Sequence, residues 1–203
     1  METSSDTYLV LDKPGISEIK IKGSRFLAEA IPVSSVEEAD AALLAIKKRD
    51  YDATHHCSAY RIGSDGNTFR YNDDGEPNSS AGLPIYRQIE GRNLTNALVV
   101  VIRYYGGTKL GTGGLVRAYG EAASLALDAA EVKEIIPRTA LRFVFDYDDT
   151  SPAMHTISQF DVIVLETSYS ERTSMTLGIR SSQIDDFRAV FLEALGGRGE
   201  EVD

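Results

Sequence analysis

The part of the chain that decides the fold reads VVVIRYYGGTKLGTGGLVRAYG, residues 99–120. It begins as an uninterrupted apolar run, which predicts a buried strand over 98–102, and it ends in the first turns of a helix predicted over 115–130. The loop between these elements holds five glycines: Gly106, Gly107, Gly111, Gly113 and Gly114. Glycines so close together indicate a backbone that turns sharply or closely approaches another group.

Positive charges flank this glycine-rich loop, at Arg103, Lys109 and Arg117. A loop that opens a helix also leaves free backbone N–H groups at the positive end of the helix dipole, and both features favour an anion. We therefore predict a contact surface for a phosphate, a carboxylate or an acidic partner. The predicted binding residues are Arg25, Arg103, Tyr104, Gly106, Gly107, Lys109, Gly111, Gly113, Gly114 and Arg117.

Two known phosphate motifs are incomplete in this loop. Residues 106–111 have the glycine spacing of a P-loop, but Thr112-Gly113 follows where Lys-Ser/Thr is required. The dinucleotide-binding fingerprint also fails, because Val116 stands at its last glycine position. Two alternatives to this binding surface are a nucleotide-binding loop, which the incomplete motifs disfavour, and a purely structural role, in which the glycines only permit a tight turn and close helix–strand packing.

A second group of candidates is the acidic loop at 73–77, where Asp73, Asp74 and Glu76 lie within four residues. Carboxylate oxygens suit Mg²⁺ or Ca²⁺, but the spacing of a calcium-binding EF-hand is absent. We favour the interpretation that these are solvated turn residues, with an aspartate bonded to nearby backbone N–H groups.

The third group is His55-His56-Cys57. Neighbouring residues of a strand face opposite sides, and a zinc ion would lack further Cys or His ligands. We therefore predict no bound metal and no cofactor, with Cys57 as a small buried thiol and the histidines bonded to the backbone. The alternative is that Cys57 is a nucleophile with a histidine base.

Composition narrows the class of protein. Of the 203 residues, 42% are hydrophobic, which supports a packed core, and no apolar run approaches the length of a membrane span. The acidic, polar first residues are not a secretory signal, and a single cysteine fits a reducing cytoplasm. The formal net charge of −10 disfavours broad, sequence-blind binding to DNA or other nucleic acid. We expect a cytoplasmic protein with no membrane association.

Periodicity and turn signals predict an α+β protein with two domains, 1–135 and 136–203, and a boundary near 132–138. The first domain is predicted to follow a polar lead-in over 1–15, with a helix capped by Ser35 and a face of the helix at 115–130 made by Leu115, Tyr119, Ala122, Leu125 and Ala129. Its strands are expected at 18–22, 25–31, 57–62, 68–71 and 98–102, and a short helix at 84–90.

The second domain is predicted to have the order βαββα, which resembles a ferredoxin-like half-fold. The strands are expected at 140–147, 162–167 and 174–180, and the helices at 151–160 and 184–195. Ser182 is predicted to cap the last helix, whose buried face is Ile184, Phe187, Val190, Phe191 and Leu195.

Several short motifs occur in order across most of residues 20–130: SRF (24–26), HHCSAY (55–60), DDGEP (73–77), AGLP (81–84) and VIRYYGGTKLGTGGLVRAY (101–119). Together they resemble the YigZ/IMPACT family, and the segment after Pro137 looks like the small C-terminal domain of its bacterial members. The resemblance implies that the first domain has a βα fold like that of a small ribosomal protein domain and domain IV of elongation factor G. It implies that the second resembles the ferredoxin-like C-terminal domains of that factor.

The same resemblance bears on function. Eukaryotic relatives regulate translation by competing for the activator of a stress kinase, and they carry an extra N-terminal interaction domain where this chain has a short polar lead-in, so that circuit is not carried over. We predict a non-enzymatic cytoplasmic binding protein that contacts structured RNA, the ribosome or a translation-related protein factor. The alternative is a small-molecule hydrolase or phosphate-ligand enzyme, with a pocket between the Asp73–Pro77 and Gly106–Gly114 loops and His55, His56 or Cys57 beside it.

Overall fold

The computed structural model describes residues 6–202, which divide into two compact units. One unit is Tyr8–Ile135, and the other contains residues 136–202 together with residues 6–7. The unit 8–135 has two sheets and two clusters of buried side chains, and the other unit has one sheet and one cluster, so each unit is described separately. That the two units are independently folding domains stays a prediction.

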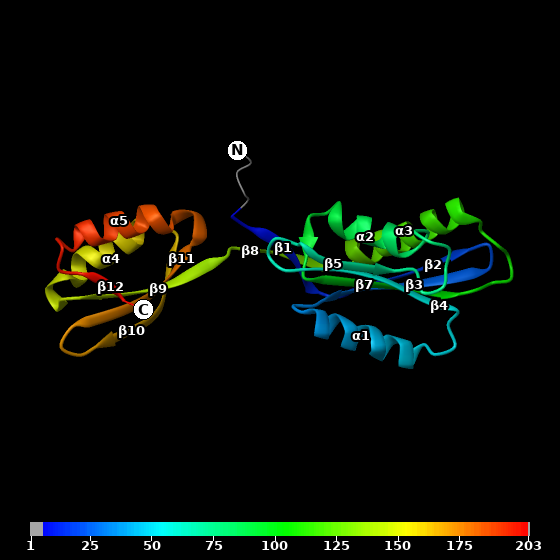
Figure 1. The fold of residues 1–203 in the computed structure, drawn as a ribbon, viewed down its shortest axis with the longest axis horizontal. Helices are drawn as coiled ribbons and strands as arrows, with labels where there is room; N and C mark the ends of the chain where they lie inside the picture. The colour runs from blue at the N-terminus through cyan, green and yellow to red at the C-terminus, as the bar shows by residue number, and fades with distance from the viewer. Residues whose placement is uncertain (1–5, 203) are drawn as a thin grey trace. The chain divides into compact units, whose positions relative to one another are not determined.

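The unit 8–135 is built on a five-stranded antiparallel sheet with the order β2-β3-β7-β4-β5 (Figure 1). Its strands are β2 (Gly15–Ile21), β3 (Ser24–Pro32), β7 (Ala97–Tyr104), β4 (His55–Ile62) and β5 (Thr68–Asn72). The apolar run that opens the glycine-rich stretch is therefore the central strand β7, as predicted.

Helices cover both faces of this sheet. Helix α1 (Val36–Arg49) lies on one face, and α2 (Gly82–Glu90) and α3 (Thr112–Asp128) lie on the other (Figure 1). Because strand residues alternate in direction, Val99 and Val101 pack toward α2 and α3 while Val100 and Ile102 pack toward α1. A strand buried on both faces explains why the sequence of β7 is continuously apolar.

A second, three-stranded sheet in this unit corrects the expectation of a polar lead-in over residues 1–15. Its order is β6-β1-β8, from β6 (Leu94–Thr95), β1 (Tyr8–Lys13) and β8 (Glu131–Ile135). Residues 8–13 are thus a strand rather than part of a polar lead-in, and they pair with residues 131–135. Each of these short strands obtains its pairing partner from a distant part of the chain, which local patterns do not reveal.

The other unit has a four-stranded sheet with the order β10-β11-β9-β12 and two helices on one face (Figure 1). Its elements are β9 (Arg138–Phe145), α4 (Thr150–Gln159), β10 (Val162–Tyr169), β11 (Thr173–Arg180), α5 (Ile184–Ala194) and β12 (Glu200–Val202), with 3₁₀ turns at Tyr147–Asp149 and Ser181–Gln183. The predicted βαββα order is confirmed. The short β12 pairs with β9 and completes the βαββαβ order of a ferredoxin-like fold.

Of the two predicted helix caps, the structure confirms the one at Ser35 and contradicts the one at Ser182. Ser35 caps α1, because the N–H of Glu38 donates to its Oγ at 3.2 Å. Ser182 does not cap α5: it lies in a 3₁₀ turn, and its hydroxyl bonds the carboxylate of Asp6.

Three residues assigned to these faces are exposed instead: Leu125 at 43%, Val190 at 39%, and Ala129, which follows the last residue of α3. In α3 the buried positions are largely alanines, which allow the helix to lie close to both the sheet and α2. A prediction based on hydrophobicity alone therefore assigns Leu125 to the buried face of α3 and overlooks alanines such as Ala126 that are buried.

Candidate functional site

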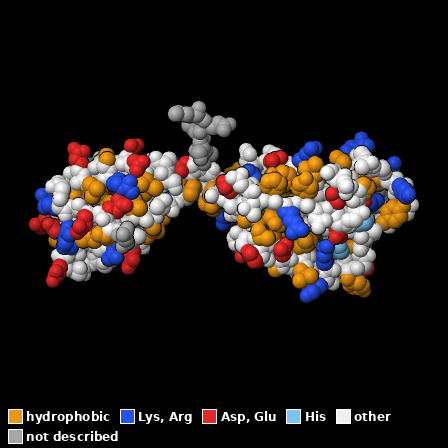
Figure 2. Space-filling view, in the orientation of Figure 1, with side chains coloured by type: hydrophobic (Ala, Val, Ile, Leu, Met, Phe, Trp, Pro, Cys, Tyr) orange, Lys and Arg blue, Asp and Glu red, His pale blue; other side chains and the backbone are white. Residues whose placement is uncertain are grey.

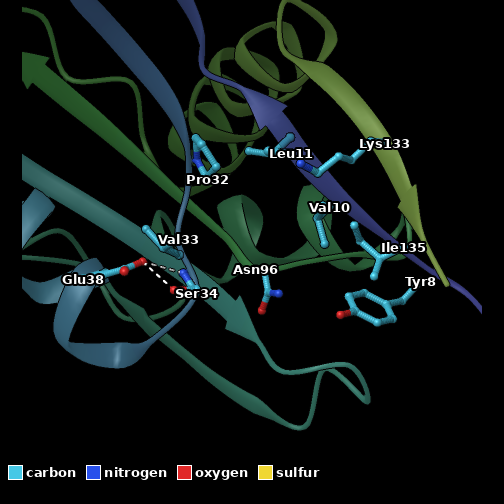
Figure 3. A pocket seen from close by; sticks show the side chains of 10 residues that line it. All are labelled: Tyr8, Val10, Leu11, Pro32, Val33, Ser34, Glu38, Asn96, Lys133 and Ile135. Carbon is cyan, nitrogen blue, oxygen red and sulfur yellow. Dashed lines mark hydrogen bonds between the residues drawn. The ribbon is translucent and has the colours of Figure 1, made fainter. Parts of the chain in front are cut away.

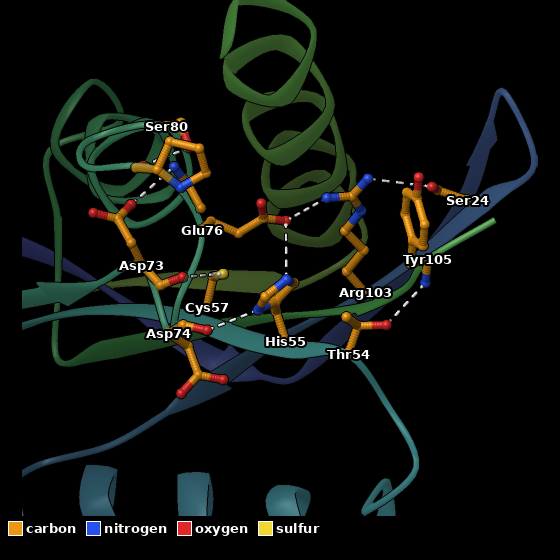
Figure 4. A network of polar contacts seen from close by, with 12 residues as sticks. Ser24, Thr54, His55, Cys57, Asp73, Asp74, Glu76, Ser80, Arg103 and Tyr105 are labelled. Atoms are coloured by element: carbon orange, nitrogen blue, oxygen red, sulfur yellow. Dashed lines mark hydrogen bonds and ion pairs between the residues drawn. The ribbon is translucent and has the colours of Figure 1, made fainter. Parts of the chain in front are cut away.

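A cleft of about 550 Å³ lies in the unit 8–135, between the loop at 73–77 and the glycine-rich loop. The start of β4, the end of β7 and the N-terminus of α3 supply the rest of its walls. Figure 4 shows several of the side chains involved. The lining residues are Thr54, His55, Glu76, Pro77, Arg103, Tyr105, Lys109, Leu110, Gly111, Thr112 and Leu115.

A buried ion pair lies in the cleft wall. Arg103 Nη1 lies 2.5 Å from Glu76 Oε1, and each side chain is only 5% exposed. The hydroxyl of Tyr119 donates to the same carboxylate oxygen at 2.8 Å, and burial raises the pKa of that tyrosine. Glu76 therefore neutralises Arg103 inside the protein, so Arg103 does not offer a free charge to an anion as its sequence position suggested.

His55 reaches the cleft from the first position of β4. Its Nδ1 lies 2.8 Å from the backbone oxygen of Asp74, which can only accept a hydrogen bond, so Nδ1 carries the proton. The other ring nitrogen, Nε2, then lies 3.9 Å from Glu76 Oε1 (Figure 4). The backbone of the acidic loop thus fixes the orientation of the imidazole toward the buried carboxylate.

The two aspartates of the acidic loop bond the chain itself. The carboxylate of Asp73 accepts hydrogen bonds from the backbone N–H groups of Ser79, Ala81 and Gly82, so it caps the start of α2 from nine residues away. Within residues 6–202 no group of three or more His, Cys, Asp or Glu side chains is placed to hold a metal ion. Of the three carboxylates predicted as a group, only that of Glu76 lines the cleft.

Asp74 has a different set of partners. Its carboxylate accepts from Lys47 Nζ at 2.8 Å and from the N–H of His56 at 2.7 Å. Burial alone raises the pKa of this carboxyl, but these hydrogen bonds and the nearby positive charge of Lys47 together hold the pKa below its usual value.

His56 and Cys57 do not line the cleft. His56 Nε2 lies 3.0 Å from the backbone oxygen of Asp50, and the fully buried Cys57 donates from Sγ to the backbone oxygen of Asp73 at 3.0 Å. Burial raises the pKa of the Cys57 thiol strongly, which keeps it protonated and unreactive.

Glycine is required at different positions of the loop for different physical reasons. A Cβ at Gly106 would lie 1.9 Å from the carbonyl carbon of Gly23, so the packing of two loops requires glycine there. Gly107 and Gly111 have φ angles of 85° and 71°, which favour glycine. Gly113 has neither reason, because it lies in the first turn of α3 with nothing within 4 Å of a Cβ at its position.

The first turn of α3 has no side-chain cap. Gly111 stands at the N-cap position and has no side chain to accept from the backbone, and the first intrahelical bond runs from the N–H of Leu115 to the oxygen of Gly111. The N–H groups of Thr112, Gly113 and Gly114 therefore have no capping acceptor among residues 6–202.

The positively charged residues predicted to bind an anion do not lie together in the structure. Lys109 and Arg117 are exposed and form no ion pair within the described part of the chain, and Lys109 lines the cleft. Figure 2 shows Lys and Arg side chains at the end of this unit where the turn between β2 and β3 lies in Figure 1.

Arg25 and Tyr104 lie on the opposite face of the sheet, which is a correction to their predicted place beside the loop. The Arg25 guanidinium stacks 4.2 Å above the ring centre of Tyr104, whose hydroxyl donates to Asp50 at 2.9 Å. Tyr105 is the residue that faces the cleft and that the candidate set lacked; it is 45% exposed. Strand alternation beyond Arg103 was the signal that could have identified it.

A second cleft of about 350 Å³ lies where β1, β8 and the start of α1 meet, lined in part by Tyr8, Glu38 and Lys133 (Figure 3). Its charged groups are already paired. The carboxylate of Glu38 accepts hydrogen bonds from the backbone N–H and the hydroxyl of Ser34, and Lys133 Nζ lies 2.6 Å from Asp12 Oδ1. The first cleft is therefore the better candidate for a functional site.

Comparison with known proteins gives several matches. The family model of the Impact N-terminal domain matches residues 22–127. The family model of a domain of unknown function, DUF1949, matches residues 143–198. The IMPACT family member YvyE of Bacillus subtilis is 33% identical over 194 residues, 96% of this chain and 89% of the relative. None of the helices within residues 6–202 is long and apolar enough to cross a membrane.

Two solved structures are also similar. A crystal structure described as that of a hypothetical protein has 29% sequence identity and a TM-score of 0.68, and it covers 97% of this chain and 96% of that one. The two-domain translational regulator Yih1 has 29% identity over 59% of this chain and 48% of its own, with a TM-score of 0.39, which is too low to support a structural argument.

Proposed function

Because this chain belongs to the IMPACT family, as its motifs predicted, we propose that it is a translation-associated regulatory protein that acts by binding rather than by catalysis. Its partner is RNA, the ribosome or a translation-related protein factor in the cytoplasm, and the contact surface is the Gly106–Gly114 loop with the first turns of α3. The family resemblance supports the translational role, since its eukaryotic members regulate translation.

One observation carries the choice of contact surface: the uncapped first turn of α3 lies beside two exposed cations that form no ion pair among residues 6–202. Those cations are Lys109 and Arg117. Free N–H groups at a helix N-terminus and nearby positive side chains are the two features that attract phosphate or carboxylate. Arg103 supports this surface indirectly, because its ion pair with Glu76 holds the end of β7 against the acidic loop.

The acidic remainder of the chain limits how such a surface binds RNA. With a formal net charge of −10, the protein repels phosphates outside the contact surface, so only a few are neutralised. We expect the slope of log affinity against log salt to be shallow, on the order of −2 to −4, whereas broad basic binders reach about −10.

The test measures binding of a structured RNA to the full chain and to two double variants. Lys109→Ala/Arg117→Ala should weaken binding and flatten the salt slope by roughly one unit for each cation that contacts phosphate. Lys48→Ala/Arg70→Ala is the matched control, because it removes two cations that form no ion pair among residues 6–202 but belong to α1 and β5. Equal weakening by both variants would contradict the proposed surface. Binding unaffected by high salt would assign an apolar protein interface instead.

The hydrolase alternative has one observation in its favour, which is that His55 lines a cleft between the two predicted loops. Its weakness is the nucleophile, since Cys57 is buried, protonated and outside the cleft. Phosphate release from p-nitrophenyl phosphate that is lost in His55→Ala would favour the hydrolase over the binding protein.

A further inference from the structure

We propose that the cleft binds a single nucleotide, with the phosphate at the uncapped first turn of α3 and the base against Tyr105. The proposal goes beyond the macromolecular contact above, because it assigns a small-molecule class to the cavity itself. It does not depend on the P-loop or dinucleotide motifs, which are incomplete in this chain.

The cavity has the size and lining of a small-molecule site. Its volume of about 550 Å³ lies within the range of roughly 300–1,000 Å³ that is typical of such sites. Leu110, Leu115 and Pro77 give it apolar walls, while the polar groups converge from the other sides. A ligand that joins an apolar, planar body to an anionic group would match both parts of this lining.

The phosphate end is argued from Gly113 and Lys109. Glycine weakens a helix, and at Gly113 neither a positive φ nor close packing requires it. The missing Cβ leaves the backbone N–H groups of the first turn open to close approach. Lys109 lines the same cleft and adds a full positive charge, and Glu76 does not oppose it, because Arg103 neutralises that carboxylate.

A second, independent observation is the buried guanidinium in the cleft wall. Arg103 is 4% exposed, and its Nε–H has no hydrogen-bond partner among residues 6–202. An unpartnered buried donor is costly, and where a protein retains one, a bound water, an ion, strain or a functional role accounts for it. Figure 4 places this guanidinium between Glu76 and Tyr105, and it lies 5.3 Å from the centre of the tyrosine ring. The positively charged guanidinium of Arg103 therefore packs against the ring of Tyr105, which lines the cleft.

The base end is argued from that ring. Tyr105 is 45% exposed, and its backbone N–H donates to Thr54 Oγ1 at 3.0 Å, which fixes the start of the loop. Stacking of a base on an exposed aromatic side chain is tolerant of base identity. We therefore expect the four nucleoside monophosphates to bind with similar affinity.

The test compares a whole ligand with its two halves by isothermal titration calorimetry on the full chain. Adenosine 5′-monophosphate should bind at least tenfold more tightly than either adenosine or inorganic phosphate. Tyr105→Ala should weaken the nucleotide about tenfold and leave inorganic phosphate unaffected. Gly113→Val should weaken both, because its side chain covers the first turn. Tyr51→Ala, at a tyrosine that is 83% exposed and outside the cleft, is the control.

One further probe distinguishes a free nucleotide from the end of an RNA chain. A 5′-phosphorylated single-stranded RNA hexamer that binds more tightly than the mononucleotide would identify the RNA end as the source, and equal affinity would identify the free nucleotide. The proposal is overturned if the mononucleotide binds no better than phosphate, or if Tyr105→Ala has no effect. If the protein binds structured RNA but not the mononucleotide, the nucleotide proposal fails and the proposed function stands. If it binds the mononucleotide but not structured RNA, the RNA-binding function fails and the nucleotide proposal stands.

Discussion

Replacing Glu76 by alanine should be among the most damaging single changes in the unit 8–135. The substitution leaves the guanidinium of Arg103, whose side chain is 5% exposed, without its counter-charge, and it leaves the Tyr119 hydroxyl without its acceptor. Removing one member of a buried ion pair costs about 3–5 kcal/mol. We expect a loss of about 4 kcal/mol, a large share of the roughly 5–15 kcal/mol that stabilises a typical domain.

Urea unfolding followed by circular dichroism measures this loss, since the chain contains no tryptophan. Three comparisons isolate the buried charge. Glu76→Gln keeps an oxygen acceptor for the tyrosine and should cost less than Glu76→Ala. Glu76→Ala/Arg103→Met removes both charges and should recover most of the lost stability. Glu18→Ala, which breaks an exposed pair with Arg25 at 3.8 Å, should cost less than about 1 kcal/mol.

Two results would refute this reasoning. A loss below about 1 kcal/mol for Glu76→Ala would mean that water reaches the ion pair and screens it. A double variant as unstable as the sum of its two single variants would mean that Glu76 and Arg103 are not coupled.

Three further outcomes follow from the same loops. Asp73→Ala should lower the free energy of unfolding by about 2 kcal/mol in urea titrations, because three N–H groups lose a charged acceptor. Gly106→Ala should destabilise the protein through its clash with Gly23, whereas Gly113→Ala should raise the melting temperature slightly; the opposite order would contradict the packing described. The lowered pKa of Asp74 makes its contribution to stability complete above the unfolded value of about 3.9 and lost as the pH falls through the folded pKa. The difference in melting temperature between the wild type and Asp74→Asn should therefore be present at pH 6 and vanish in strong acid.

Much of the fold could be predicted from local sequence. The continuous apolar run of β7 indicates a strand buried on both faces, and the structure confirms it as the centre of its sheet. The Ser35 cap and the βαββα order after Pro137 were also visible, because capping and periodicity depend on residues a few positions apart. Short strands such as β1 and β12 were not, since their pairing is with distant segments.

The candidate site shows the same division between local and distant interactions. The sequence alone determined that the glycine-rich loop opens a helix and carries positive charge. Only the tertiary structure decided which charges are free, because the partner of Arg103 lies 27 residues away in another loop, and which tyrosine faces the cleft. A side chain's charge is a property of its type, but its availability depends on the groups that the folded chain packs against it.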